Sequence, residues 1–293
     1  LLPTTVFRFS SFTYESFVIS LLSLGIALFV TEYLSEEKIQ TKRTMVSILA
    51  MVVGCFSKAV YIPFLALYWL MPKDKFYSRR QKNLFKAGIF VLLILMFASF
   101  ILPLIGNVTS GAEVGDYRGG DTSQTSQLSM ILGYPLTYTG VLLKSLGTTF
   151  ASYFIGSKVL ANFAYRGIYD GIGYFVVLLT MLFTFVTDFG MTEKTYDAQM
   201  KRKILMMKIW NAVLIFGTAC LVWTALYLDF TPVGSMVING VSPRYYLPLI
   251  FPLSLIFINQ KVRCSMKLEN YQSLIAFLML IGTGISIYCL MLA

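Results

Sequence analysis

The stretch that decides the fold runs from Met45 to Met71 and reads MVSILAMVVGCFSKAVYIPFLALYWLM. One continuous helix of this length would join two basic loops across a membrane and would place Lys58 near its centre. A lysine at that depth costs about 2.5–3.5 kcal/mol on insertion scales. Two short helices avoid both problems, with Gly54 to Lys58 near the outer tip and Pro63 just inside the returning helix. The sequence therefore predicts a hairpin whose tip carries Lys58 near the outer membrane surface.

The composition of the whole chain points to the same environment. Hydrophobic residues make up 57% of the 293 residues, charged residues only 13%, and the mean hydropathy is +0.71. A soluble domain typically has about a quarter of its residues charged. Several apolar runs approach the roughly 20 residues that cross a bilayer. We therefore expect an integral membrane protein surrounded by membrane lipids.

The apolar runs and the loops between them predict the topology. The runs fall near residues 16–31, 44–71, 87–105, 167–187, 209–228, 244–258 and 271–292. Four intervening loops hold most of the 24 Lys and Arg residues: Lys38 to Arg43, Lys73 to Lys86, Lys194 to Lys208, and Lys261 to Lys267. Because short cytoplasmic loops carry the excess of positive residues, these four loops are placed inside the cell. The same distribution argues against a nucleic-acid partner, in spite of the net charge of +10.

The region between Pro103 and Tyr165 has no basic loop and is expected outside. We predict a loop over 106–127 and amphipathic or re-entrant helices over 128–160. The expected fold is all-α. It is a single polytopic transmembrane helical bundle over residues 1–293, with about eight membrane helices, two of them the short hairpin. Residues 106–166 form an external loop and interfacial helices. Because the chain starts at Leu1 without a methionine or signal peptide, we expect the native N-terminal part to be missing.

A second informative stretch runs from Asn239 to Pro248 and reads NGVSPRYYLP. Ser242 is expected to cap a helix whose first residue is Pro243. The free N–H groups and the dipole of such a helix favour an anion, and Arg244 adds a full charge at the same place. The topology puts this end of the helix on the face opposite the basic loops. The stretch therefore predicts a site for a phosphate or carboxylate at a membrane surface.

Two interpretations of Arg244 stay open. It is either part of an anion site or an interfacial anchor helped by Tyr245 and Tyr246, since tyrosine favours that depth. The hairpin places Lys58 on the same surface, so the two cations form a predicted pair. A separation beyond roughly 20 Å, far more than a Debye length of about 8 Å, would rule out a shared phosphate site.

Glu15 is the candidate catalytic carboxylate and lies where the first apolar helix is expected to start. It could simply favour the positive end of a helix capped by Thr13. The other interpretation is a carboxylate that faces an external cavity, as a base or as a hydrogen-bond partner of a sugar.

The sequence offers no clear metal site. The acids Glu113, Asp116 and Asp121 could hold a divalent ion, but their spacing fits no EF-hand-like loop. The chain has no histidine, and its four cysteines have no metal-like or disulfide-like spacing. We therefore expect no cofactor.

Three stretches together resemble a known family: Leu2-Pro3 before the first helix, Ser57 to Pro63 at the hairpin, and Gly240 to Pro248 near the end. The family consists of bacterial polytopic membrane proteins of unknown function in which a Gly-Val-Gln-Gly-Arg-Tyr-Phe-type motif precedes a late helix. In this chain Ser242-Pro243 replaces the Gln-Gly pair. Members resemble C-type (GT-C) membrane glycosyltransferases, which take a sugar from a polyprenyl-phosphate carrier on the outer membrane face. The resemblance implies a catalytic carboxylate in a first external loop, which would precede Leu1.

The resemblance and the external cations lead to one hypothesis of function. We expect a glycosyltransferase-like enzyme of the bacterial plasma membrane in cell-envelope glycan synthesis, with a polyprenyl-phosphate sugar donor and a glycan acceptor. Lys58, Arg244, Tyr245 and Tyr246 would hold the lipid phosphate, and Glu15 would activate the acceptor hydroxyl. Two alternatives remain: a transporter or flippase of lipid-linked glycans, and a non-catalytic membrane subunit. Ionisable residues deep within several helices, which a transporter should carry, are nearly absent.

Overall fold

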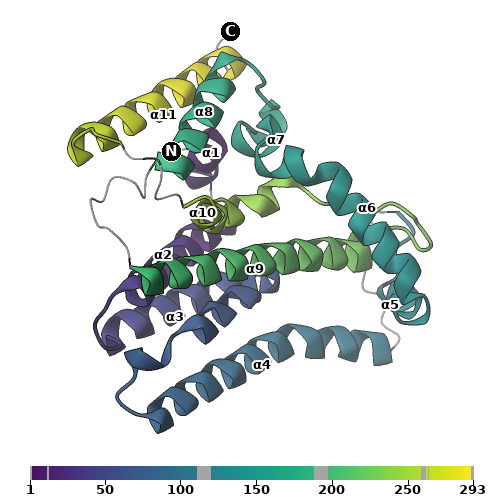
Figure 1. Cartoon of the computed structure of the whole chain (residues 1–293). Helices are drawn as coiled ribbons and strands as arrows, with labels where there is room; N and C mark the ends of the chain where they lie inside the picture. The colour runs from purple at the N-terminus through teal and green to yellow at the C-terminus, as the bar shows by residue number, and fades with distance from the viewer. Residues whose placement is uncertain are drawn as a thin grey trace. The chain divides into compact units, whose positions relative to one another are not determined.

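The computed structural model describes residues 2–11, 13–110, 120–187, 197–258, 262 and 264–291, with the side chains of residues 104 and 107–110 left aside. These residues form helices and one isolated bridge, Asn162 with Ile168, but no strand. The α-helices, labelled in Figure 1, are α1 (Pro3–Ser10), α2 (Tyr14–Leu34), α3 (Thr41–Phe56), α4 (Arg79–Ser110), α5 (Gln124–Gly133), α6 (Pro135–Phe154), α7 (Ser157–Leu160), α8 (Ile172–Thr187), α9 (Ala198–Phe230), α10 (Leu247–Ile256) and α11 (Leu268–Met291). The 3₁₀-helices are η1 (Ala59–Leu70), η2 (Lys73–Lys75), η4 (Ala164–Arg166) and η6 (Pro243–Tyr246). The all-α expectation is confirmed for the described part of the chain.

Four of the described helices are long and apolar enough to cross a membrane: Tyr14–Leu34, Arg79–Pro103, Ala198–Phe230 and Leu268–Leu290. Two shorter apolar helices, Ala59–Leu70 and Ile172–Thr187, accompany them. The structure therefore supports a membrane protein with several apolar helices. It does not confirm the expected number of about eight spans.

The chain divides into two compact units, each built from separate segments. Unit 1 consists of residues 1–20, 151–212 and 246–293. Unit 2 consists of residues 21–150 and 213–245. Helices α2 and α9 contribute residues to both units.

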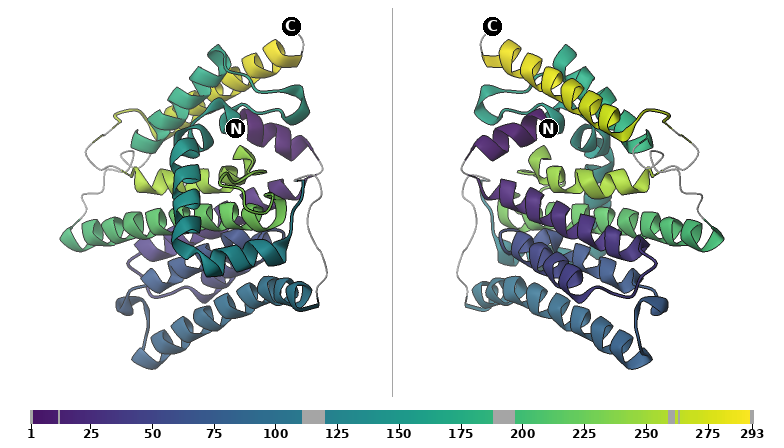
Figure 2. Two further views of the ribbon diagram at one scale, coloured as in Figure 1. Left: turned by 90° about the vertical axis from the view of Figure 1, so that its right-hand side faces the viewer. Right: turned by 90° about the vertical axis from the view of Figure 1, so that its left-hand side faces the viewer.

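Unit 2 contains the hairpin that the charge pattern predicts. Helix α3 ends at Phe56, the chain turns through Ser57 and Lys58, and η1 returns beside α3 with α4 packed against it (Figure 1 and Figure 2). The returning arm is a 3₁₀-helix, which rises about 2.0 Å per residue against about 1.5 Å for an α-helix. The 12 residues of η1 therefore cover about the same length as the 16 residues of α3, roughly 24 Å. Lys58 lies at the tip and not within an apolar arm.

Polar contacts fasten the hairpin to α2 inside the apolar layer. The hydroxyl of Ser47 on α3 donates to the backbone oxygen of Gly25 on α2 at 2.5 Å. The hydroxyl of Tyr68 on η1 in turn donates to Ser47. All three elements are thus joined by one short hydrogen-bond chain, as buried hydroxyls in an apolar environment require.

The two basic loops at the other end of the hairpin meet each other. The backbone N–H of Ile39 donates to the carbonyl of Lys75 at 2.9 Å, and Nζ of Lys38 donates to the carbonyl of Asp74 at 2.7 Å. These loops precede α3 and follow η1, so they occupy the end opposite Lys58. This arrangement agrees with the placement of both loops on one side of the membrane.

Unit 1 is held together by a close contact between α8 and α11 (Figure 1). A Cβ atom on Gly173 would lie 2.6 Å from the carbonyl oxygen of Gly282, and a Cβ on Gly282 would lie 2.9 Å from that of Gly173. Only glycine allows the two backbones to approach this closely, as at other helix crossings in membranes. The pair therefore fixes where the two helices cross.

The region from 106 to 166 differs from the predicted loop followed by interfacial helices. Helix α4 continues through Pro103 to Ser110, so the first residues of the predicted loop are helical. Helices α5, α6 and α7 occupy most of the remainder, in agreement with the helices expected after residue 128. Glu113, Asp116 and Arg118 lie outside the described residues, as do Lys194, Lys261 and Arg263 of the later basic loops.

Candidate anion site around Tyr245

The ring of Tyr245 lies close to both of the cations that the sequence singles out. Nζ of Lys58 is 3.6 Å from the ring centroid, and Cζ of Arg244 is 5.3 Å from the same point. Both distances are measured to the centroid of the Tyr245 ring, so the separation of the two charged groups cannot exceed their sum. That sum is about one Debye length. The structure thus brings Lys58, Arg244 and Tyr245 together within unit 2, well inside the separation that a shared site requires.

Two residues at the start of η1 hold Tyr245. Lys58 precedes η1 and has an extended backbone, and its carbonyl accepts the N–H of Tyr61 at 3.4 Å. The Tyr61 hydroxyl donates to the backbone oxygen of Tyr245 at 2.7 Å, and Nζ of Lys58 lies over the Tyr245 ring. The hairpin tip therefore contacts both the backbone and the side chain of Tyr245.

A glycine turn directs the chain into this arrangement. Gly240 has a φ of 78°, a conformation that favours glycine, and a Cβ atom there would clash with the ring of Phe230. Helical geometry then begins at Pro243, as expected, but the first turn is the 3₁₀ segment η6. The regular helix α10 starts only at Leu247. Arg244 therefore lies in the first turn of a helix, as the sequence predicts, although that turn is 3₁₀.

Buried polar residues anchor the loop that leads to Gly240. Thr231 is fully buried, and its hydroxyl accepts the N–H of Asn239 at 3.1 Å. The side-chain amide of Gln127, also fully buried, donates to the carbonyls of Thr231 at 2.9 Å and Pro232 at 3.0 Å. These bonds fix both ends of the loop, so the position of Arg244 depends on Gln127 and Thr231. Sequence reasoning did not identify either residue, because a single polar residue carries no local sign of such a role.

Tyr246, the other predicted tyrosine, has different surroundings. Its side chain belongs to unit 1, is 2% exposed, and packs edge-on against Tyr153 and Phe154 with ring centroids 5.4 and 4.8 Å away. Such contacts are typical of an aromatic cluster in a core. The structure therefore assigns Tyr245 to the pair of cations and Tyr246 to packing.

Glu15 is one half of a buried ion pair in unit 1. Its Oε2 lies 3.4 Å from Nε of Arg8 on α1, and both side chains are less than a tenth exposed. Glu15 is in the first turn of α2, where its charge also favours the positive helix end. The carboxylate is thus held in place by a cation, which fits a structural role and leaves the catalytic role a prediction.

Potential metal-ligating side chains are scattered in the part of the chain that the structure describes. Among the described residues, no three or more His, Cys, Asp or Glu side chains come together as a metal site would require. Asp121 is in the described part, whereas Glu113 and Asp116 are not.

The arrangement around Tyr245 suits a phosphate chemically. Two unit charges no further apart than this upper limit repel each other by at least about 2 kcal/mol at an effective dielectric constant near 20, so an anion that contacts both is favoured. Arginine binds phosphate through paired N–H donors, and lysine acts as a mobile point charge. Lys58, Arg244 and Tyr245 are all half-buried, which weakens screening by salt without closing the site.

Fold and site together define a polytopic helical membrane protein with a cationic cluster at one end of a membrane hairpin. The chain belongs to the family described as "Predicted membrane protein (DUF2142)", whose model matches residues 1–253. The matched range includes the hairpin and the residues around Arg244, and it ends before α11. No curated protein and no solved structure matches the chain.

Proposed function

We propose that the protein is a glycosyltransferase-like enzyme of the plasma membrane that uses a polyprenyl-phosphate-linked sugar at the outer face, in cell-envelope glycan synthesis. The observation that carries the proposal is the convergence of Lys58 and Arg244 on Tyr245, at the end of the hairpin opposite the basic loops. In this proposal the two cations neutralise the phosphate of the carrier lipid as the sugar leaves it. The outer face follows from the positive-inside rule applied to those loops.

The surroundings of the cluster suit a phosphate that is attached to a long apolar chain. Lys58 lies between two apolar arms, α3 and η1, and Arg244 lies three residues before the apolar helix α10. A polyprenyl carrier keeps its chain in hydrocarbon and its phosphate at the interface, so it needs cations close to apolar helices. A water-soluble phosphate ligand has no such need.

Stabilising the charge of the leaving phosphate is a recognised source of catalysis. A carboxylate would then take the proton of the acceptor hydroxyl, and Glu15 is the candidate for this base. Glu15→Gln keeps the shape of the side chain and removes the basic oxygen. A folded Glu15→Gln variant that transfers sugar normally would eliminate Glu15 from the reaction and would leave the phosphate site untouched.

The decisive experiment is glycan transfer in proteoliposomes that contain a polyprenyl-phosphate-linked sugar and a glycan acceptor. Arg244→Ala should abolish transfer, because it removes the paired donors for the phosphate. Arg166→Ala is the matched control, since Arg166 also lies over a tyrosine, at 5.6 Å from the ring of Tyr165, but is exposed. Unchanged transfer in Arg244→Ala would show that the assignment is wrong.

The same vesicles separate the enzyme from the other two classes. Movement of the lipid-linked sugar across the bilayer without a glycan product would indicate a transporter or flippase. Inactivity of the protein alone, with a separate catalytic subunit that co-purifies, would indicate a non-catalytic membrane subunit. Loss of polyprenyl-phosphate binding in Arg244→Ala is expected for all three, so binding tests the site and transfer tests the reaction.

A further inference from the structure

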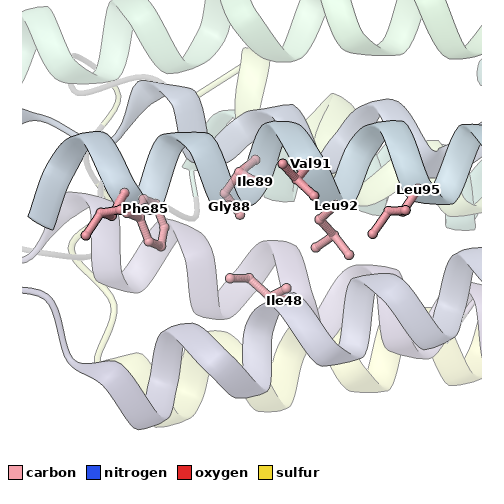
Figure 3. A pocket seen from close by; sticks show the side chains of 8 residues that line it. Ile48, Phe85, Gly88, Ile89, Val91, Leu92 and Leu95 are labelled. Carbon is pink, nitrogen blue, oxygen red and sulfur yellow. The ribbon is translucent and has the colours of Figure 1, made fainter.

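We infer that a groove between α3 and α4 binds an acyl chain of an anionic phospholipid, whose headgroup lies at the end of α4 that carries the basic loop. The groove has a volume of about 460 Å³, within the roughly 300–1,000 Å³ of known ligand sites. Figure 3 shows Ile48 of α3 facing α4, where Phe85, Gly88, Leu92 and Leu95 line the groove. Leu84 of α4 also lines it.

The groove exists because one position of α4 has no side chain. Gly88 lies four residues after Leu84 and four before Leu92, so the three share one face of the helix. A Cβ atom on Gly88 would have no neighbour within 4 Å. The gap between the two leucines is therefore open space that no part of the described chain fills.

The side chains that line the groove are apolar and exposed, so the groove suits an apolar ligand. Leu84 is 64% exposed and Leu95 is 61% exposed, and both belong to a helix that can span a membrane. At this depth the neighbours of an exposed leucine are lipid tails. A flexible acyl chain can enter a groove of this shape without any polar partner.

Two basic residues at one end of the groove favour a negatively charged lipid headgroup. Arg80 precedes Leu84 by four residues and Lys82 precedes Phe85 by three, so both basic residues continue the groove face toward the helix start. Arg80 is exposed and Lys82 half-buried. Each such charge near a membrane surface attracts an anionic headgroup, and the positive end of the α4 dipole acts in the same direction. An anionic phospholipid on the side of the basic loops therefore fits better than a zwitterionic one.

This site is separate from the one proposed around Tyr245. Lys58 follows the C-terminal end of α3, whereas Arg80 belongs to the loop end of the hairpin. A carrier lipid held by Lys58 would have its phosphate at the opposite end of α3. The two lipid sites therefore differ in headgroup position and are tested independently.

The test uses phosphatidylglycerol with a photoreactive diazirine on one acyl chain, in phosphatidylcholine liposomes that contain the protein. After illumination, mass spectrometry of peptides from α3 and α4 measures the labelling. We expect labelled peptides from both helices in the wild-type protein. Gly88→Leu should reduce labelling to background, because its side chain occupies the groove without a clash. Gly106→Leu on the same helix is the matched control, since a Cβ there also meets nothing within 4 Å.

The headgroup is tested by the double variant Arg80→Gln/Lys82→Gln. It should lower labelling by phosphatidylglycerol about fivefold for each charge removed, and labelling by the matching phosphatidylcholine probe should not change. This variant leaves the apolar lining intact, so it keeps the inference testable if Gly88→Leu does not fold. Equal labelling by both probes, or no effect of the double variant, would overturn the inference.

Other occupants would give different products. A dimer in the liposomes whose α3 and α4 peptides stay unlabelled would show that a second copy covers the groove. Displacement of the phosphatidylglycerol probe by polyprenyl phosphate would show that the groove holds the carrier chain. Either result would contradict a phospholipid site.

Discussion

The two ends of the α3–η1 hairpin both carry cations, but they use them differently. At the loop end, the buried carboxylate of Glu32 lies 3.5 Å from Arg43 and 4.0 Å from Lys75, and it accepts the backbone N–H of Gln40 at 3.0 Å. Lys75 also donates to the carbonyl of Glu37 at 2.9 Å. At the tip, the group that Lys58 and Arg244 share is the ring of Tyr245. A carboxylate cancels positive charge, whereas a neutral ring positions it without cancelling it.

The number of lysine and arginine residues at one end of the hairpin is therefore not enough to identify an anion site. The loop end has more lysine and arginine than the tip, yet its buried cations act as structural ties between α2, α3 and the turn after η1. At the tip, two cations lie close to one aromatic ring. We therefore expect mutations at the loop end to change stability and mutations at the tip to change binding.

The largest effect is expected for Glu32→Gln. This change leaves Lys75, which is 1% exposed, and Arg43 without the carboxylate that they face. Removing one partner from a buried ion pair typically costs about 3–5 kcal/mol. Equilibrium unfolding in mixed micelles should show a loss of this size, with polyprenyl-phosphate binding unchanged in the protein that remains folded.

Glu36→Gln is the matched control for that experiment. Glu36 is exposed and lies in the bend that follows α2, so its replacement should change the free energy of unfolding by less than about 0.5 kcal/mol. If the two variants unfold alike, Glu32 does not tie the loop end together, and the contrast between the two ends disappears.

Lys58→Gln should show the opposite behaviour. Hydrogen bonds to a charged group typically contribute about 1.5–3 kcal/mol, so binding of polyprenyl phosphate should weaken about tenfold to a hundredfold. Stability should stay nearly the same, because Lys58 is half-buried and lies at a hairpin tip. Titration with polyprenyl phosphate and an unfolding curve on the same sample measure both quantities. A large loss of stability with unchanged binding would make Lys58 structural, like Lys75.

Tyr61→Phe tests whether the hairpin tip positions the site. The change removes the hydrogen bond from the Tyr61 hydroxyl to the Tyr245 carbonyl and keeps the buried ring. A typical hydrogen bond contributes about 0.5–1.5 kcal/mol, so binding should weaken by about tenfold or less. Because Tyr61 bonds the backbone carbonyl of residue 245 and not its ring, Tyr245→Leu keeps this bond, and the loss caused by Tyr61→Phe should persist in that background. Unchanged binding in Tyr61→Phe would show that the hairpin tip does not position the site.

The hairpin could be predicted from sequence because the free-energy cost of one buried lysine argues against a single long helix. The cost of Lys58 at the centre of a span excluded one long helix, and the basic loops on both sides required an even number of crossings. The 3₁₀ form of η1 was not predictable, since apolar composition fits either helix type. The extension of α4 to Ser110 was missed because the apolar run ends near residue 105 and the residues that follow are small and polar, a composition typical of a loop.

The sequence identified only those residues of the site whose type is unusual at their position in the chain. Lys58 and Arg244 stand out because charge is rare beside apolar runs. Tyr61, Gln127 and Thr231 were missed because each looks like an ordinary polar or aromatic residue until the structure shows which carbonyl or amide it holds. The adjacent tyrosines could not be told apart from sequence, since their difference arises from the 3₁₀ turn η6 that separates their directions.

The smallest effect on polyprenyl-phosphate binding is expected from substitutions of Tyr245, whose ring lies close to both cations. Tyr245→Phe keeps the aromatic face and removes only the hydroxyl, so binding of polyprenyl phosphate should be nearly unchanged. Tyr245→Leu keeps much of the apolar bulk and removes the face that attracts both cations, which should weaken binding by about 0.5–1 kcal/mol, or roughly two- to fivefold. The comparison of the two variants by titration isolates the ring from the hydroxyl. If Phe and Leu bind alike, Tyr245 does not organise Lys58 and Arg244, and the contrast between the tip and the loop end loses its basis.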